Sequence, residues 1–311
     1  LEIDRGEYNP IFGRSYNEIG AESRSYHRTQ TMGRLQDVGE SSTKFYLESS
    51  TVGYREKETS FFDGIDHSIS GIARHAGDEE YRVPFLRNEL QAVERQIEKA
   101  IAVYNPLYPE TVVPYLISTL GKFREIKNNV LSSALSTEKQ DYILFYLDQK
   151  IDETQETIVK AAGLKLEVFS DEELYIPGET IDTSIRVINR SEIPVTLREI
   201  GLRSGQTSVT NEIERDLPYN VLYSQKMSLT IPLDTPTSRV FWELEDGIPG
   251  SLGSLVVAPS EYSMINQPFR PYPVMGFAKV IIAGEEVNLV QPSQYRIRDT
   301  VTGEFRDPTA V

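Results

Sequence analysis

The hydrophobic positions of this chain change their spacing twice along its length. Over residues 1–76 they keep no regular period, and breakers such as Asn9-Pro10 interrupt the segment at short intervals. From Val83 to Gly163 apolar residues recur every three or four positions, the period of an α-helix. From Lys165 onward they alternate with polar residues, the period of a β-strand. The pattern predicts an irregular first region, a helical second region and a β-rich third region.

The helical region, expected over residues 77–163, should contain three helices. The first carries apolar side chains spaced so that they share one helical face: Leu86, Leu90, Val93, Ile97 and Ile101. Pro114 suits the first turn of a second helix. Thr137 followed by Gln140 is a capping-box pattern for a third helix, and Gly163 is placed to end it. Short connections between three helices predict a small antiparallel bundle.

The β-rich region is expected to span residues 164–311. Residues 181–187 alternate between apolar and polar side chains, and turn-forming residues flank them at 176–179 and 189–191. Further stretches also fit strands: 227–231, 277–283 and 291–299. Short strands separated by turns predict an antiparallel β-sandwich of immunoglobulin-like type, followed by further β-structure. The fold class is therefore expected to be α+β with several domains.

The first region, residues 1–76, predicts one helix from Tyr16 to Met32 and one short strand from Lys44 to Leu47. The helix has a thin apolar face, and the segment as a whole buries too little surface to fold alone. We therefore expect it to dock on another part of the protein. The first residue is Leu1 rather than Met, which fits a processed or excised end preceded by a signal peptide or by a whole domain.

Composition narrows the classes of function. The chain has 311 residues, 32 of them basic and 47 acidic, with a formal net charge of −15. A surface this acidic argues against a nucleic-acid partner, because phosphate binding needs positive charge. The absence of cysteine excludes disulfides and thiolate metal sites. No run of about 18 apolar residues occurs, so no membrane-spanning helix is expected.

One segment near the start carries a family resemblance. It reads Ser-Arg-Ser-Tyr-His-Arg-Thr-Gln-Thr-Met-Gly-Arg-Leu over residues 23–35, and Phe-Phe-Asp-Gly-Ile-Asp follows at 61–66. Together these resemble the closing segment of the catalytic domain in LmbE/PIG-L-type zinc de-N-acetylases. Later, Tyr-Arg-Ile-Arg-Asp at 295–299 with Gly303-Glu304 is similar to a segment of the family's longer members. The sequence Phe-Trp-Glu-Leu at 241–244 departs from their pattern.

The resemblance implies that residues 1–76 are the tail of a deacetylase-like catalytic domain. The remainder would be the C-terminal accessory region of an enzyme that hydrolyses N-acetyl groups from amino sugars or related glycoconjugates. The expected partners are then the missing N-terminal catalytic domain and a glycan. The accessory domains of the family also imply a periplasmic or secreted location.

Within this resemblance, His27 could stabilise the oxyanion or act as an acid, and Arg28 and Gln30 could bind substrate. The family holds zinc with two histidines and an aspartate, from Ala-His-Pro-Asp-Asp-like and His-x-x-His-like motifs. This chain contains neither motif, and its three histidines are His27, His67 and His75. We expect no metal site here and zinc only in the missing domain, so the chain alone should be inactive. The alternative is that His27 is an ordinary surface residue of a helix.

Asp63, Asp66 and His67 form a second cluster of oxygen and nitrogen donors. Such a cluster could hold a hard cation, or it could be an acidic turn around Gly64. The ligand count falls short of what calcium or zinc requires, which favours the turn.

Aromatic side chains in the third region offer a different functional hypothesis. Trp242 and Tyr262 are candidates to stack against sugar rings, because aromatic rings present flat apolar faces. Phe241, Phe269 and Tyr272 could line the same groove. The alternative is that these rings are core residues or loop anchors. On this hypothesis the chain is a non-enzymatic carbohydrate- or protein-binding module; a third hypothesis is a structural spacer.

Overall fold

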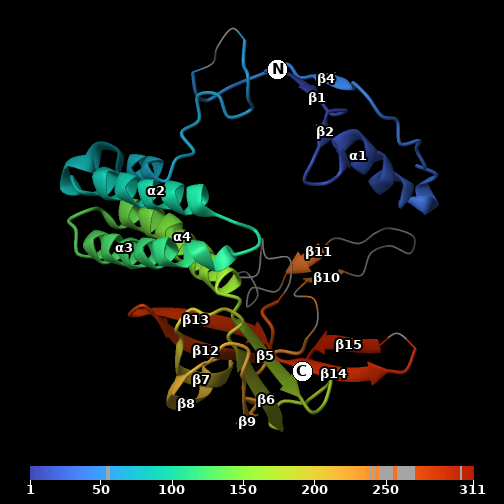
Figure 1. Cartoon of the computed structure of the whole chain (residues 1–311), viewed down its shortest axis with the longest axis vertical. Helices are drawn as coiled ribbons and strands as arrows, with labels where there is room; N and C mark the ends of the chain where they lie inside the picture. Colours follow the sequence, from blue (N-terminus) through green and yellow to red (C-terminus); the bar gives the residue numbers. More distant parts are fainter. Residues whose placement is uncertain (54–56, 239, 241, 245–254, 258–269, 302) are drawn as a thin grey trace. The chain divides into compact units, whose positions relative to one another are not determined.

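The structure is a computed structural model that describes residues 1–53, 57–238, 240, 242–244, 255–257, 270–301 and 303–311 (Figure 1). The chain divides into two compact units, Leu1–Gly71 and Ile72–Val311. Helices and strands both contribute to each unit, so the protein belongs to the mixed α+β class that its sequence predicts. The three long helices and the two large sheets all lie in the second unit, where α3 and α4 contact β13.

Unit 1 is built from short elements. They are β1 (Glu2–Asp4), β2 (Tyr8–Asn9), β3 (Arg14–Ser15), α1 (Tyr16–Ser25), η1 (Arg28–Gln30) and β4 (Ser42–Lys44). A capping box begins α1: the Ser15 hydroxyl accepts from the N–H of Glu18, and the Glu18 carboxylate accepts from the N–H of Ser15 at 2.8 Å. The reciprocal bonds satisfy two backbone donors that a helix start leaves open.

The first helix is shorter than its sequence predicts. It ends at Ser25 rather than Met32, and Thr31 adopts a left-handed backbone with φ of 52°. The Ser25 hydroxyl accepts from the N–H of Arg34, which folds the following residues back toward the helix end. The predicted strand at Lys44–Leu47 is also displaced, since β4 ends at Lys44. A thin apolar face gives little packing to extend either element.

Unit 1 buries very little apolar surface. Leaving glycine aside, Ala21 is the one buried apolar residue among the described residues of unit 1. Most of its large apolar side chains are exposed, including Phe12, Tyr26, Phe61 and Phe62. A segment without a core gains little from the hydrophobic effect and stays marginal by itself.

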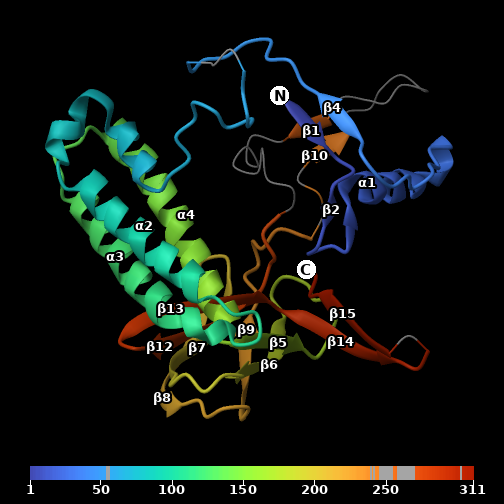
Figure 2. The same ribbon diagram turned by 45° about the horizontal axis from the view of Figure 1, so that its top comes forward.

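The helices of unit 2 follow the predicted periodicity. They are η2 (Ser70–Arg82, which crosses the unit boundary), α2 (Leu86–Val103), η3 (Pro109–Val112), α3 (Val113–Leu131) and α4 (Thr137–Ala161). α2 packs on α3, and α3 packs on α4 (Figures 1 and 2). Their shared core includes the fully buried Leu90, Leu120, Phe123, Ile143 and Leu147. No helix in the described part of the chain is long and apolar enough to cross a membrane.

Two helix-end details differ from expectation, and one agrees. Ser136, not Thr137, is the N-cap of α4, and the predicted capping box with Gln140 does not form. The Gln140 side-chain amide instead donates to the carbonyl of Val130 at 2.8 Å, so it closes the end of α3. Gly163 ends α4 with φ of 62°, as predicted.

Two sheets form the β region. The five-stranded sheet has the order β15-β14-β5-β6-β9, and the four-stranded sheet has the order β13-β12-β7-β8. The strands are β5 (Lys165–Ser170), β6 (Thr180–Ile188), β7 (Thr196–Ser204), β8 (Thr207–Asp216), β9 (Leu222–Thr230), β12 (Met275–Ile282), β13 (Glu285–Pro292), β14 (Gln294–Asp299) and β15 (Gly303–Pro308). All neighbours are antiparallel except β5 and β14, which run parallel. In a separate two-stranded sheet, β10 (Trp242–Leu244) pairs antiparallel with β11 (Leu255–Val257).

The two sheets face each other closely at β5 and β12. A Cβ atom added to Gly276 would lie 2.4 Å from Cγ2 of Val168, far inside van der Waals contact. Glycine at this position therefore sets the spacing of the sheets. The layer between them is filled by apolar side chains that include the fully buried Ile181, Ile185 and Leu197.

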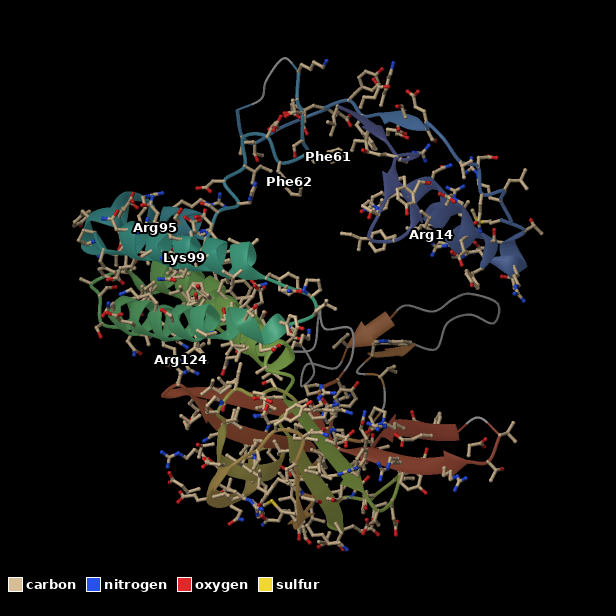
Figure 3. All side chains as sticks on the ribbon, viewed as in Figure 1. Arg14, Phe61, Phe62, Arg95, Lys99 and Arg124 are labelled. Atoms are coloured by element: carbon tan, nitrogen blue, oxygen red, sulfur yellow. The ribbon has the colours of Figure 1, made fainter. Side chains whose placement is uncertain are left out.

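A buried amide ties the helices to the four-stranded sheet. Oε1 of Gln155, on α4, accepts from the backbone N–H of Asn288 at 3.2 Å and from Arg124 Nη2 at 3.3 Å. Arg124 projects from α3 and also pairs with Glu285 at 2.9 Å (Figure 3). The edge strand β13 thus satisfies one of its outward N–H groups with a helix side chain.

We predict that Gly276→Ala destabilises the protein by about 1–3 kcal/mol, because overpacking a close contact forces the sheets apart. Val168→Ala should also destabilise it, by loss of buried methyl groups. Combined, the two changes should cost less than their sum, since the smaller side chain relieves the clash. Denaturant unfolding of the wild type, both single variants and the double variant measures this coupling. Strictly additive costs would show that the contact does not set the sheet spacing.

Candidate binding site

The residues that the resemblance selects lie at the end of α1. His27 stands between α1 and η1, while Arg28 and Gln30 begin and end η1; all three are exposed. Within the described ranges, no hydrogen bond or ion pair involves their side chains. The three residues are close in sequence, but no other part of the described chain encloses them. His27 lies just before η1 rather than on a helix.

The acidic cluster of unit 1 forms a turn. The carboxylate of Asp63 accepts from the N–H of Thr59 at 2.7 Å, and Asp66 accepts from the N–H of Ser68 at 3.0 Å. Gly64 lies between them with φ of 81°. The neighbouring Phe61 and Phe62 side chains are exposed (Figure 3). Across the described residues, no group of three histidine, aspartate or glutamate side chains is placed to hold a metal ion.

The predicted sugar-stacking pair is described in part. Trp242 lies opposite Val257 in the β10–β11 sheet, with 36% of its surface exposed. Tyr262, Phe241 and Phe269 lie outside the described residues. Tyr272 is half exposed.

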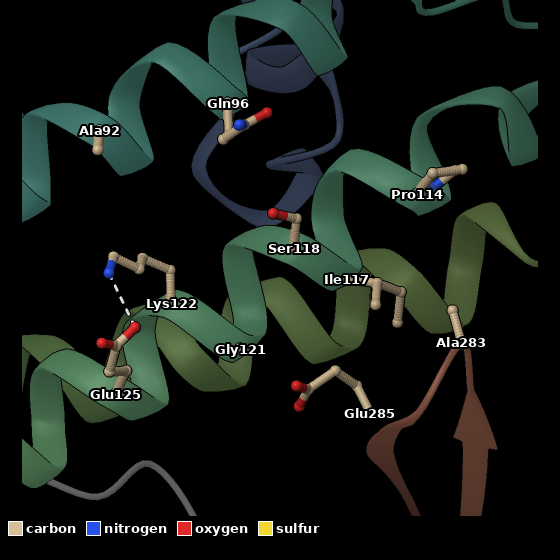
Figure 4. Close-up of a pocket in the computed structure, with 10 residues that line it drawn as sticks. All are labelled: Ala92, Gln96, Pro114, Ile117, Ser118, Gly121, Lys122, Glu125, Ala283 and Glu285. Carbon is tan, nitrogen blue, oxygen red and sulfur yellow. Dashed lines mark hydrogen bonds and ion pairs between the residues drawn. The ribbon is translucent and has the colours of Figure 1, made fainter.

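The first of three notable hollows in unit 2 lies between α2, α3 and the β12–β13 turn, with a volume of about 540 Å³ (Figure 4). Its charged groups compensate one another: Lys122 pairs with Glu125 at 2.8 Å, and Glu285 pairs with Arg124. The hydrogen bond to Glu125, helped by the nearby Glu89 and opposed by burial, raises the pKa of the Lys122 ammonium. A hollow with balanced charges has little reason to select an ion.

The second hollow lies on the outer face of the five-stranded sheet, over Phe169. The ring points away from the core, yet only 6% of the residue is exposed. Three guanidinium groups cover the ring. Measured from the guanidinium carbon Cζ to the ring centroid, the distances are 4.2 Å for Arg296, 5.1 Å for Arg306 and 5.8 Å for Arg186. These distances are those of cation–π contacts. Three different strands therefore deliver positive charge to one aromatic ring.

Glu167 holds two of the three arginines in place. Its carboxylate pairs with Lys165 at 2.7 Å, with Arg306 at 3.1 Å and with Arg186 at 3.3 Å. Burial alone would raise the pKa of Glu167, but the hydrogen bonds from Lys165 and Arg306 outweigh it and hold the pKa below its ordinary value. Arg306 also pairs with Glu304.

Arg296 differs from its two neighbours. Within the part of the chain that the structure describes, no carboxylate forms an ion pair with Arg296, and its side chain is exposed above the ring. The hollow beside it has a volume of about 420 Å³. Besides Arg296, its lining includes Asp171, Ser184, Arg186 and Ser224. A planar guanidinium fixed by stacking presents its donors to a carboxylate or another oxyanion.

Little in the sequence predicts this site. Arg296 and Arg306 lie opposite each other in the neighbouring strands β14 and β15, but Arg186 lies far from both in the sequence, and only the strand order brings it close to them. Phe169 follows Val168 in β5, so the strand shows an apolar pair instead of strict alternation. That break in the pattern is the one signal of an outward aromatic ring.

Comparisons with known proteins assign no family. No family model matches the chain, and no curated protein matches it. Among solved structures, the sporulation control protein Spo0M from Bacillus subtilis aligns with 41% of this chain and 47% of its own, about half its length, at 13% identity and a TM-score of 0.24. The alkylpurine DNA glycosylase AlkC from Pseudomonas fluorescens aligns with 71% of this chain and 61% of its own, at 8% identity and a TM-score of 0.22. A β-glucosidase from Erythrobacter marinus aligns with 41% of this chain and 15% of its own, at 8% identity and a TM-score of 0.18. Similarity at this level assigns neither fold family nor function.

We predict that Glu167→Gln destabilises the protein at pH 7 by roughly 1–3 kcal/mol, because a hydrogen-bonded charge is lost among three cations. The folded-state pKa of Glu167 lies below its ordinary 4.5, so its contribution is present above that pH and disappears as the pH falls further. The stability gap between variant and wild type should therefore shrink between pH 5 and pH 3. Denaturant unfolding at several pH values measures the gap.

Glu304→Gln is the matched control, since this carboxylate also pairs with Arg306 but is about half exposed. Its effect on stability should be small at every pH. A Glu167→Gln gap that stays constant from pH 7 to pH 3 would contradict the role assigned to Glu167.

Proposed function

We propose that the chain is a non-enzymatic binding module and that the hollow over Phe169 binds an acidic sugar. The observation that carries the proposal is Arg296, a guanidinium stacked on a buried ring and left without a carboxylate partner among the described residues. The carboxylate of a uronic acid is the complementary group, because it accepts two parallel hydrogen bonds from a guanidinium. The stacking contact lowers the entropy cost of binding by fixing the donor in advance.

The remaining lining supports a sugar over an extended peptide. The floor of the hollow is the face of paired strands, whose backbone groups are already used in the ladders between β5, β6 and β9. A peptide strand would need free backbone groups at a sheet edge. The hydroxyls of Ser184 and Ser224, which lie 3.3 Å apart, and the carboxylate of Asp171 match the donors and acceptors of a polyhydroxylated ring.

The overall charge supports recognition at short range. A net charge of −15 repels an anionic ligand at a distance, so attraction must come from the local cations. Arg186 and Arg296 supply it within the hollow. Binding is thus expected to be modest in affinity and specific for a ligand that reaches Arg296.

The proposal extends to the architecture of unit 2. We propose that α2, α3 and α4 form an antiparallel three-helix bundle and that the two facing sheets form an immunoglobulin-like sandwich. The succession of helices with short connections and the mainly antiparallel strand order support this assignment. The parallel pairing of β5 with β14 is a local departure from an all-antiparallel sandwich.

We predict that Arg296→Ala weakens the binding of D-glucuronate about tenfold or more, because hydrogen bonds to charged groups contribute about 1.5–3 kcal/mol. Arg298→Ala is the matched control: it removes an arginine from the same strand, two residues further along and outside the hollow. NMR titration with D-glucuronate, D-glucose and acetate measures the affinities. Equal shifts with glucose and glucuronate, or equal affinity for the Arg296→Ala variant and wild type, would reject an acidic-sugar site.

A second candidate function is the accessory region of an LmbE/PIG-L-like de-N-acetylase outside the cell or in the periplasm. The observation that favours it is unit 1, whose exposed apolar side chains are those of a segment that packs on another body. In such an assembly His27 would face the catalytic domain, and zinc would be bound there.

We predict that the coding sequence upstream of Leu1 contains an Ala-His-Pro-Asp-Asp-type motif. Genome sequencing of that region decides the point. An upstream sequence that lacks the motif rejects the de-N-acetylase candidate and leaves the acidic-sugar site untouched, since Arg296 and Phe169 do not depend on it.

A further inference from the structure

A third hollow adjoins the one over Phe169. It has a volume of about 460 Å³ and lies where α4, β5, β13 and β14 meet. Lys165, Glu167 and Phe169 occupy alternate positions of β5 and share its outer face. Lys165 and Glu167 line the third hollow, whereas Phe169 lines the second. The two hollows are therefore consecutive along one strand, over about 13 Å from Lys165 to Phe169 at roughly 3.3 Å per residue.

The two hollows share a boundary made by one ion-pair network. Glu167 bonds to Arg186, which lines the second hollow, and to Arg306, which lines the third. Arg306 also lies over the Phe169 ring. A ligand that crosses from one hollow to the other therefore passes over groups whose positions are already fixed.

The charged groups of the third hollow differ from those of the second. Its cations, Lys165 and Arg306, are both paired with Glu167. Asp152 and Glu156 add carboxylates from the exposed face of α4; Glu156 pairs with Lys160 at 2.7 Å, whereas Asp152 forms no ion pair among the described residues. Amide groups of Gln291 and Gln294 and the half-exposed Val290 complete much of the wall. Carboxylates and amides accept hydrogen bonds from hydroxyl and N–H groups, and they repel a second carboxylate.

We infer that the ligand is a glycan in which acidic and neutral sugars alternate, with an acidic sugar over Phe169 and a neutral sugar between α4 and β13. The inference rests on the proposed function, because it extends the same site by one sugar. The unpaired Arg296 selects the acid, and the carboxylate-lined hollow selects the neutral neighbour. An all-acidic chain would place its second carboxylate against Asp152, whose charge no cation in the described residues pairs with.

Isothermal titration of the full chain tests the inference with three probes: D-glucuronate, a hyaluronan tetrasaccharide in which glucuronate alternates with N-acetylglucosamine, and an oligogalacturonate tetramer. For the wild type, we expect the alternating tetrasaccharide to bind at least tenfold more tightly than glucuronate and more tightly than the all-uronate tetramer. Asp152→Ala combined with Gln291→Ala should remove most of that gain and leave glucuronate affinity unchanged. Glu153→Ala, an exposed carboxylate on the same helix outside the hollow, should change nothing.

The outcomes distinguish a failure of the extended site from a failure of the proposed function. Glucuronate binding that depends on Arg296, with no gain for the tetrasaccharide, overturns the extended site and leaves the proposed function standing. An all-uronate tetramer that binds as tightly as the alternating one overturns the alternation. Loss of tetrasaccharide affinity in the Asp152/Gln291 double variant with an unchanged melting temperature supports the inference. Absence of binding to every probe overturns both the inference and the proposed function.

Discussion

The close approach of the two sheets at Gly276 determines which side chains of β5 point into the core and which point to the outer face of the sheet. Val168 can lie against β12 only because Gly276 has no side chain. Since successive side chains of a strand point to opposite faces, an inward Val168 requires an outward Glu167 and an outward Phe169. A slip of one residue would turn the whole set over. The hollow over Phe169 thus follows from a packing requirement in the core, even though none of its charged residues belongs to the core.

The outward Phe169 in turn organises the charge on that face. An exposed aromatic ring on a flat sheet would be an adhesive patch, and the three arginines cover it while keeping their charge in water. Glu167 neutralises part of that charge and leaves Arg296 available. Close to this face, where α4 meets β13, Gln155 serves a comparable purpose because its side-chain oxygen accepts from a backbone N–H of β13. In both places, polar side chains cover a group that would otherwise be exposed: an aromatic ring in the first case and a backbone N–H in the second.

The sequence predicted the elements better than the site. Helical spacing located α2, α3 and α4 to within a few residues, because each buries one apolar stripe. It failed at Ile101, which lies on the predicted face yet is 70% exposed, while the neighbouring Ala100 is buried. It also missed β8, whose residues are largely exposed on both faces and so lack a burial pattern. The hollow over Phe169 was beyond reach for a different reason. Arg186 and Phe169 meet Arg296 and Arg306 only through the strand order of the sheet, and the local spacing of residues does not predict strand order.

The parallel pairing of β5 with β14 has a consequence for how the protein is made. Arg306 and Glu167 are 139 residues apart, and β14 pairs with a strand that is synthesised long before it. Contacts so distant in sequence form slowly, because the loop between them must be closed before they return any stabilisation. Until β14 and β15 are made, only Arg186 lies over the Phe169 ring, because Arg296 and Arg306 belong to those last strands. A chain interrupted before β14 would therefore leave the ring more exposed than it is in the finished protein.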